Sequence, residues 1–75
     1  MTPAQCRAAR ALLNLSQKEL AISSGVSLRS VQGFEAGERE LRSMALNTIT
    51  RILEEKGVVL VTESTKIGVV MTGLS

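Results

Sequence analysis

Few residues in this sequence could carry chemistry. The chain has no histidine and one cysteine, Cys6, so it lacks the usual neutral-pH general base and cannot form an intrachain disulfide or a multi-cysteine metal site. Arg10 and Glu35 could be interpreted as a catalytic pair, but the sequence offers no plausible nucleophile–base pair and no glycine-rich phosphate loop. We therefore expect no catalytic residue, no metal and no cofactor, and an enzyme is the least supported class of function.

The side chains that suit recognition of nucleic acid lie instead in the stretch SQKELAISSGVSLRSVQGFEAG, residues 16–37. Ser16 opens an S-x-x-E capping box, which predicts the start of a helix, and Gly25 supplies the left-handed residue that commonly ends one. Ser27 is a second N-cap, for a helix over Leu28–Glu35. Two short capped helices joined at a glycine are typical of a helix-turn-helix, whose second helix enters the DNA major groove.

The flanking segments predict the elements that position this motif. Thr2 followed by proline predicts a helix over Pro3–Leu13, and Ser43 is expected to cap a longer helix over residues 44–56. Residues 58–62 and 67–71 are short and rich in β-branched side chains, which predicts two strands and a hairpin. We therefore divide the chain into a DNA-binding domain over residues 1–57 and a C-terminal β segment over residues 58–75.

By itself the predicted hairpin would have little stability and would tend to pair with other strands. An isolated two-stranded hairpin is marginally stable in water, and an unpaired apolar edge is a liability. We therefore expect the segment to pair with a second copy of the chain as a homodimer, which could form a four-stranded intermolecular sheet. The alternative is that the hairpin is only a lid on its own helices. The predicted interface residues are Val58, Val59, Leu60, Val61, Ile67, Val69 and Met71.

Size and charge set the class of protein. Seventy-five residues make one small domain with a net charge of +2, and residues 1–34 hold four basic side chains against one acidic side chain. This weak basic bias suits a DNA-binding protein. Arginines interrupt any N-terminal apolar run, and no stretch approaches the roughly 20 apolar residues of a membrane span. We expect a cytoplasmic, nucleoid-associated protein of a bacterium or phage, without contact with a membrane.

The ordered pattern L-S-Q-x-E-L-A-(x3)-G-V-S-(x3)-V-(x3)-E-x-G begins at Leu15, and Arg10 and Leu13 precede it. With these residues the chain resembles the Cro/phage-repressor-type, or Xre family, of helix-turn-helix regulators over residues 6–53. The resemblance implies a mainly α fold, a four- to five-helix lambda-repressor-like DNA-binding domain to which the short β-hairpin is added. It also implies that Arg10 and Glu35 form an internal salt bridge between two helices rather than a catalytic pair.

Position by position, the resemblance places the N-terminal half of the helix Leu28–Glu35 in the major groove. Arg29 is favoured to bond O6 and N7 of a guanine, with a phosphate contact or a solvated side chain as alternatives, and Gln32 could bond adenine or the DNA backbone. Gly33 either lets the helix approach closely or marks a place where nothing is read. The predicted base contacts are Ser27, Leu28, Arg29, Gln32 and Gly33, and the predicted phosphate contacts are Gln17, Ser30, Arg39 and Arg42.

Two functions remain in view. The first is a dimeric, sequence-specific regulator, above all a repressor that could control its own gene, reading a pseudo-palindromic operator in double-stranded DNA. The second is an antitoxin or another component with the same DNA-binding domain and a tail that binds a partner protein. The tail is rich in β-branched residues, whereas tails that fold on binding are usually polar, so the sequence favours self-association.

Overall fold

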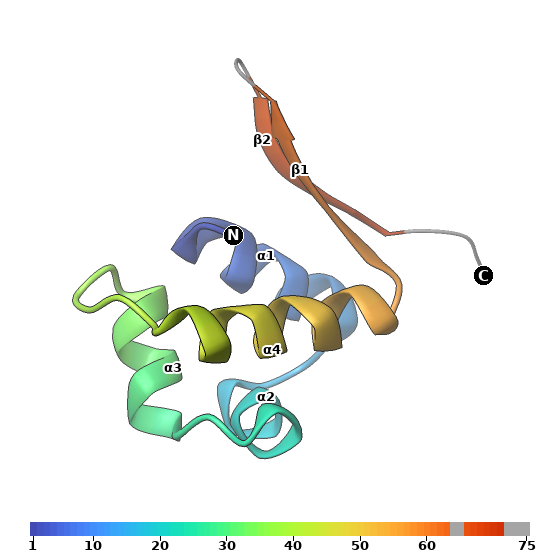
Figure 1. The fold of residues 1–75 in the computed structure, drawn as a ribbon. Coiled ribbons are helices and arrows are strands. Elements are labelled where there is room, and N and C mark those ends of the chain that lie inside the picture. The colour runs from blue at the N-terminus through green and yellow to red at the C-terminus, as the bar shows by residue number, and fades with distance from the viewer. Residues whose placement is uncertain (64–65, 72–75) are drawn as a thin grey trace.

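The computed structural model describes residues 1–63 and 66–71 of the chain. In this part, helices precede a two-stranded hairpin (Figure 1). The hairpin rises from the end of α4 on one side of α1 and α4, and α2 and α3 lie on the other side (Figure 1). The elements are α1 (Pro3–Leu13), α2 (Gln17–Ser24), α3 (Leu28–Glu35), α4 (Ser43–Glu55), β1 (Val58–Glu63) and β2 (Lys66–Met71). The mainly α fold class with a C-terminal β-hairpin is confirmed.

Side-chain caps fix where the first three helices begin, as their sequence signals predict. The hydroxyl of Thr2 accepts a hydrogen bond from the backbone N–H of Gln5 at 3.1 Å, and the hydroxyl of Ser16 accepts from that of Glu19 at 3.0 Å. Ser27 caps α3 in the same way. Each cap satisfies a backbone N–H that has no partner within its helix.

The start of α4 differs from the prediction that Ser43 is its N-cap. Arg42 is the N-cap, with φ −62° and ψ 150°, and Ser43 is the first helical residue. The carbonyl of Arg42 accepts the first helical hydrogen bond from the N–H of Leu46 at 2.9 Å, and no side chain caps this end. The helix therefore gains its start from the backbone and from its apolar stripe rather than from a serine hydroxyl.

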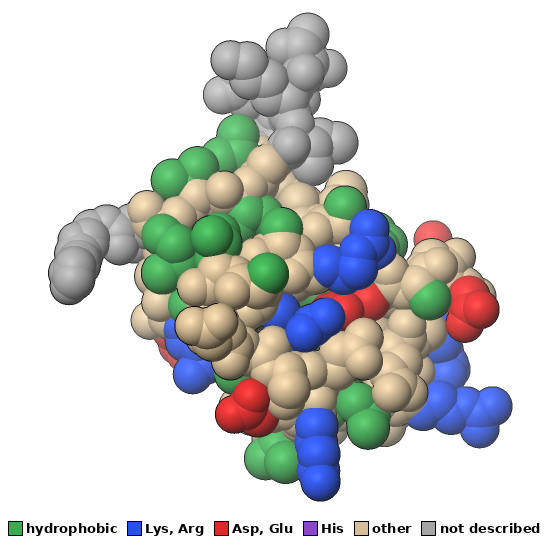
Figure 2. Space-filling model, turned by 180° about the vertical axis from the view of Figure 1, so that it is seen from behind, with side chains coloured by type: hydrophobic (Ala, Val, Ile, Leu, Met, Phe, Trp, Pro, Cys, Tyr) green, Lys and Arg blue, Asp and Glu red, His purple; other side chains and the backbone are tan. Residues whose placement is uncertain are grey.

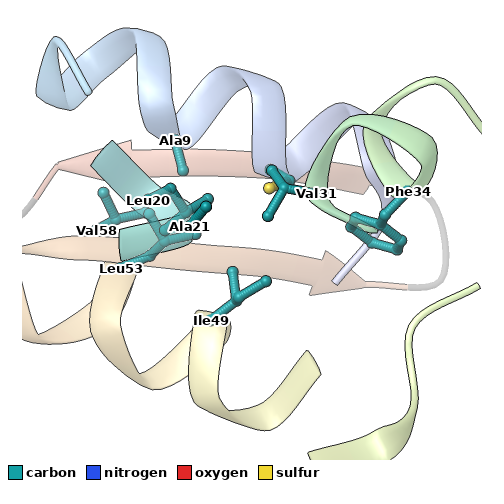
Figure 3. Close-up of a cluster of buried hydrophobic side chains, with 9 residues drawn as sticks. Ala9, Leu20, Ala21, Val31, Phe34, Ile49, Leu53 and Val58 are labelled. Atoms are coloured by element: carbon teal, nitrogen blue, oxygen red, sulfur yellow. The ribbon is translucent and has the colours of Figure 1, made fainter. Parts of the chain in front are cut away.

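The core is aliphatic apart from one aromatic ring. Leu20, Val31, Ile49 and Leu53 are fully buried, and Phe34 closes one end. Figure 3 shows their side chains converging between the helices and the hairpin. The buried hydrophobic residues are Cys6, Ala9, Leu20, Ala21, Val31, Phe34, Ile49, Leu53 and Val58. None of the helices in the described ranges is long and apolar enough to cross a membrane.

The hairpin has one face on the helices and one face turned away from them. Its antiparallel register pairs Leu60 with Val69, which both pack against the core, and pairs Val59 with Val70, which are 43% and 53% exposed. Side chains alternate between the faces of a strand, and cross-strand partners share a face. We call the side that carries Val59, Val61, Gly68 and Val70 the outer hairpin face. A side chain added at Gly68 would meet no atom within 4 Å.

This arrangement corrects part of the predicted dimer interface. Val58 is only 2% exposed and belongs to the core of its own chain, so it is unavailable to a partner and that part of the prediction is wrong. Leu60 and Val69 are likewise turned toward the helices. The side chain of Ile67 lies outside the described residues. The inner face of the hairpin is therefore a lid, as the alternative proposed, while its outer face is uncovered.

A glutamine on α1, which the sequence analysis did not single out, holds the hairpin in place. The side-chain Nε2 of Gln5 donates to the carbonyl of Val61 at 2.9 Å and to that of Gly68 at 3.0 Å. These two residues are partners across the hairpin. Gln5 is 2% exposed, so the strands are anchored to α1 by buried polar contacts as well as by apolar packing.

Candidate DNA interface

The turn between α2 and α3 sets the angle of the motif. Gly25 caps α2 with φ +74° and donates its N–H to the carbonyl of Ala21 at 2.9 Å. This left-handed conformation suits glycine because it has no Cβ to clash with the backbone. Val26 then packs against the core, and α3 begins directly after Ser27. The two helices are thereby fixed by a short turn with its own apolar anchor.

Helix α3 has two distinct faces. Val31, Phe34 and Glu35 are buried against the other helices. Leu28, Arg29 and Gln32 are exposed on the opposite side. The structure thus brings these three predicted reading residues together on one solvent-facing side of a short, anchored helix.

Two serines among the predicted DNA contacts are engaged with each other. The hydroxyl of Ser27 accepts from the backbone N–H of Ser30 at 3.1 Å and donates to the Ser30 hydroxyl at 2.9 Å. Both side chains therefore support the start of α3. Their contacts with DNA remain predictions.

Gly33 is where the structure departs most from the predicted reading residues. It is buried, and a Cβ on it would lie 2.4 Å from Cδ of Arg39. Its carbonyl accepts from the backbone N–H of Glu38 at 2.9 Å and from that of Arg39 at 3.3 Å. Gly33, one of the predicted base contacts, is therefore not exposed on α3, because the loop after α3 folds back and the stem of Arg39 covers the glycine.

The basic residues of this loop lie at different places. Arg39 is exposed and lines a shallow hollow together with Arg29, Gln32 and Glu38. Arg42 is exposed at the start of α4. Of these two predicted phosphate contacts, Arg39 therefore adjoins the exposed face of α3, whereas Arg42 lies at the start of α4.

The carboxylate of Glu35 links three helices. Arg10 donates to its two oxygens from Nε and Nη2, each at 2.7 Å, and Gln17 donates to it from Nε2 at 3.0 Å. The thiol of Cys6 donates to it at 3.1 Å. Arg7 adds a hydrogen bond from Nη1 to the backbone carbonyl of the same glutamate. The last turn of α3 is thus fastened to α1 and α2.

These contacts shift two pKa values in opposite directions. Burial alone would raise the pKa of Glu35, but the hydrogen bonds from Arg10, Gln17 and Cys6 outweigh it and lower the pKa. Burial, followed by the hydrogen bond to Glu35, raises the pKa of Cys6 to about 12. A protonated, buried thiol is a poor nucleophile. A carboxylate that is 2% exposed and hydrogen-bonded to three side chains offers no access to a substrate.

Gln17, a predicted phosphate contact, also has a structural role, because its side chain bonds Glu35 within the protein. Its amide is half-buried at the start of α2 and joins that helix to Glu35. Arg7 and Gln5 were missed altogether by reasoning from the sequence. The Thr2-x-x-Gln5 spacing is a capping-box signal for the backbone role of Gln5, but nothing in the sequence marks its bonds to the hairpin. Across the described residues, no group of three or more acidic, cysteine or histidine side chains could hold a metal.

Comparison with protein families shows which family the helices belong to. Residues 7–58 match the family model HTH_3, described as helix-turn-helix. The matched segment runs from α1 to the first residue of β1 and so includes the whole α2–turn–α3 unit. No curated protein matches the chain.

Proposed function

The chain belongs to the Xre/Cro/lambda-repressor-type helix-turn-helix family of DNA-binding regulators, and from this premise we propose that it is a dimeric repressor. In this proposal α3 of each protomer lies in the major groove of one half of a pseudo-palindromic operator. A bound dimer represses by excluding other proteins from the same DNA, and it can control its own gene if the operator lies beside that gene.

The two-faced character of α3 carries the proposal. Its buried face and the Glu35 contacts hold the helix rigidly, and its exposed face presents three side chains with different chemistry. A guanidinium at Arg29 can bond guanine bidentately, an amide at Gln32 can bond adenine, and Leu28 can contact a thymine methyl group. In helix-turn-helix proteins the N-terminal residues of the second helix are the ones that reach base edges.

The outer hairpin face supports a dimer. Val59 and Val70 lie side by side on it, more than two-fifths exposed, and a two-stranded hairpin leaves both of its edges unpaired. Figure 2 shows, on the face behind that of Figure 1, hydrophobic side chains gathered at the upper left and Lys and Arg side chains mainly across the middle and lower parts. A second copy of the chain would bury the valines without covering α3, because the hairpin and α3 lie on opposite sides of α1 and α4 (Figure 1).

Selection of binding sites from a randomised DNA duplex library tests the DNA-binding part of the proposal. We expect an inverted repeat whose half-sites lie about 34 Å apart, one helical turn of DNA. Arg29→Ala should relax the preference at one position in each half-site by about 1–3 kcal/mol. Enrichment of no sequence, or an Arg29→Ala variant that keeps the full preference, would contradict the proposed role of α3.

Sedimentation equilibrium on the full chain tests the dimer. Truncation after Gly57 would remove Val58 from the core, so a point substitution on the outer hairpin face is the sharper perturbation. We expect a dimer for the wild type, a monomer for Val70→Lys, and a dimer for the control Ile22→Lys, which alters a strongly exposed residue of α2. A Val70→Lys variant that still forms a dimer would place the interface elsewhere.

A further inference from the structure

The side chain of Arg39 packs directly against Gly33, although the two residues lie six positions apart in the sequence. The stem of Arg39 lies over the glycine so that an added Cβ would come within 2.4 Å of Cδ and 2.7 Å of Cγ of the arginine. Real Cβ atoms essentially never approach another heavy atom so closely. The arginine can keep this place only while residue 33 has no side chain.

Backbone hydrogen bonds also hold the loop that carries Arg39 against Gly33. The carbonyl of Gly33 accepts hydrogen bonds from the N–H groups of both Glu38 and Arg39. The loop is therefore drawn back against α3 at the point where Arg39 begins. Backbone and side chain together direct the arginine toward the exposed side of α3.

The charge at this point suits a polyanion. Arg39 and Arg29 line the same shallow hollow beside Gln32. In the described part of the chain neither guanidinium is paired with a carboxylate, although Glu38 also lines the hollow. Two unpaired guanidinium groups beside the exposed face of a reading helix favour the phosphate oxygens that flank the groove.

We propose that Gly33 is a positioning residue: its missing side chain lets Arg39 cross α3 and bind a DNA phosphate beside the bases faced by Arg29 and Gln32. Gly33 itself touches no DNA. This inference rests on the proposed function, because it assumes that α3 enters the major groove. It adds a specific contact and assigns its geometry to a residue that is buried in the free protein.

The test compares Gly33→Ala, Arg39→Ala and the double variant in DNA binding across a range of salt concentrations. Alanine at position 33 should push the flexible arginine aside while favouring the helix, since alanine is a better helix former than glycine. We expect its Tm to rise by roughly 2–8 °C. We expect its affinity to fall by roughly 5-fold per protomer at about 0.15 M salt, with the salt slope smaller by about 0.9.

The double variant separates this mechanism from any other effect of the glycine. If Gly33 acts through Arg39, the Gly33→Ala change should alter DNA affinity in the wild type and leave it unaltered in the Arg39→Ala background. Arg51→Ala serves as a control because it removes an exposed arginine from α4. If Gly33→Ala instead lowers the Tm, removal of Arg39 should restore it by relieving the clash.

Each outcome decides the matter. A Gly33→Ala variant with wild-type affinity and salt slope, or one whose loss simply adds to that of Arg39→Ala, overturns the positioning role while leaving the proposed function intact. Wild-type protein that selects no DNA sequence overturns the proposed function and this inference with it. A higher Tm together with a loss of affinity that disappears in the Arg39→Ala background supports the inference.

Discussion

Substitution of Arg10 by methionine should leave a buried carboxylate without its cation. Methionine retains much of the length of the arginine stem but none of its donors, so the two 2.7 Å bonds to Glu35 are lost. Removing one partner of a buried ion pair costs about 3–5 kcal/mol. Because Gln17 and Cys6 still donate to Glu35, we expect the lower end, about 3 kcal/mol. For a domain of this size that lowers the Tm by about 12–24 °C.

The pH dependence gives this prediction a second signature. The lowered pKa of Glu35 in the wild type contributes stability above its unfolded value of about 4.3, and this stability is lost as the pH falls through the folded-state pKa. Without Arg10, burial prevails and should raise the pKa of Glu35 above its unfolded value. The variant then gains stability as the carboxyl takes up a proton, so its deficit relative to the wild type should shrink between pH 7 and pH 4.

The assay is thermal and urea unfolding followed by circular dichroism at one fixed protomer concentration, because the proposed dimer would make the Tm depend on concentration. Arg51→Met, at an exposed arginine of α4, should change stability by less than about 0.5 kcal/mol. Adding Glu35→Gln to Arg10→Met should recover part of the loss. An Arg10→Met variant with unchanged melting but lost DNA binding would refute the structural role and make Arg10 a DNA contact.

Three further outcomes follow from the structure. Leu20→Ala should cost about 2–5 kcal/mol in urea unfolding because the side chain is fully buried, whereas Leu12→Ala, at a residue that is 48% exposed, should stay within about 0.5 kcal/mol. The raised pKa of Cys6, about 12, should make its alkylation by iodoacetamide far slower in the folded protein than in urea, and equal rates would contradict its burial beside Glu35. Gln5→Leu should cost about 1–3 kcal/mol and speed amide exchange in β1 and β2; unchanged protection would show that apolar packing alone holds the hairpin.

The helices could be predicted because their signals are local. Thr2, Ser16 and Ser27 each bond a backbone N–H three residues away, so sequence spacing alone contains the geometry. The turn at Gly25 is local in the same sense. At α4 the local signal gave the wrong N-cap. Ser43 is a residue type that often caps helices, but Arg42 is the N-cap here and no side chain makes a capping hydrogen bond.

The remaining features depend on segments that are distant in the chain. Strand alternation predicts that Val58 and Val59 lie on opposite faces, but only the packing of β1 on α4 shows which of them is buried. The bonds from Gln5 span 56 and 63 residues, and no spacing rule reaches that far. Gly33 could be identified as unusual for a reading position, but its reason lies in the path of the loop that carries Arg39.

The division of α3 into a buried face and an exposed face also bears on how such a protein can evolve. Val31, Phe34 and Glu35 hold the helix, and none of them is exposed for reading. Leu28, Arg29 and Gln32 are exposed, so substitutions there should change stability little. If these three side chains read the operator as proposed, one copy of a duplicated gene can acquire a new operator by changes at these positions without first gaining stabilising mutations elsewhere. Changes at Gly33 would be different under its proposed positioning role, because they would displace Arg39 and weaken binding to every operator at once.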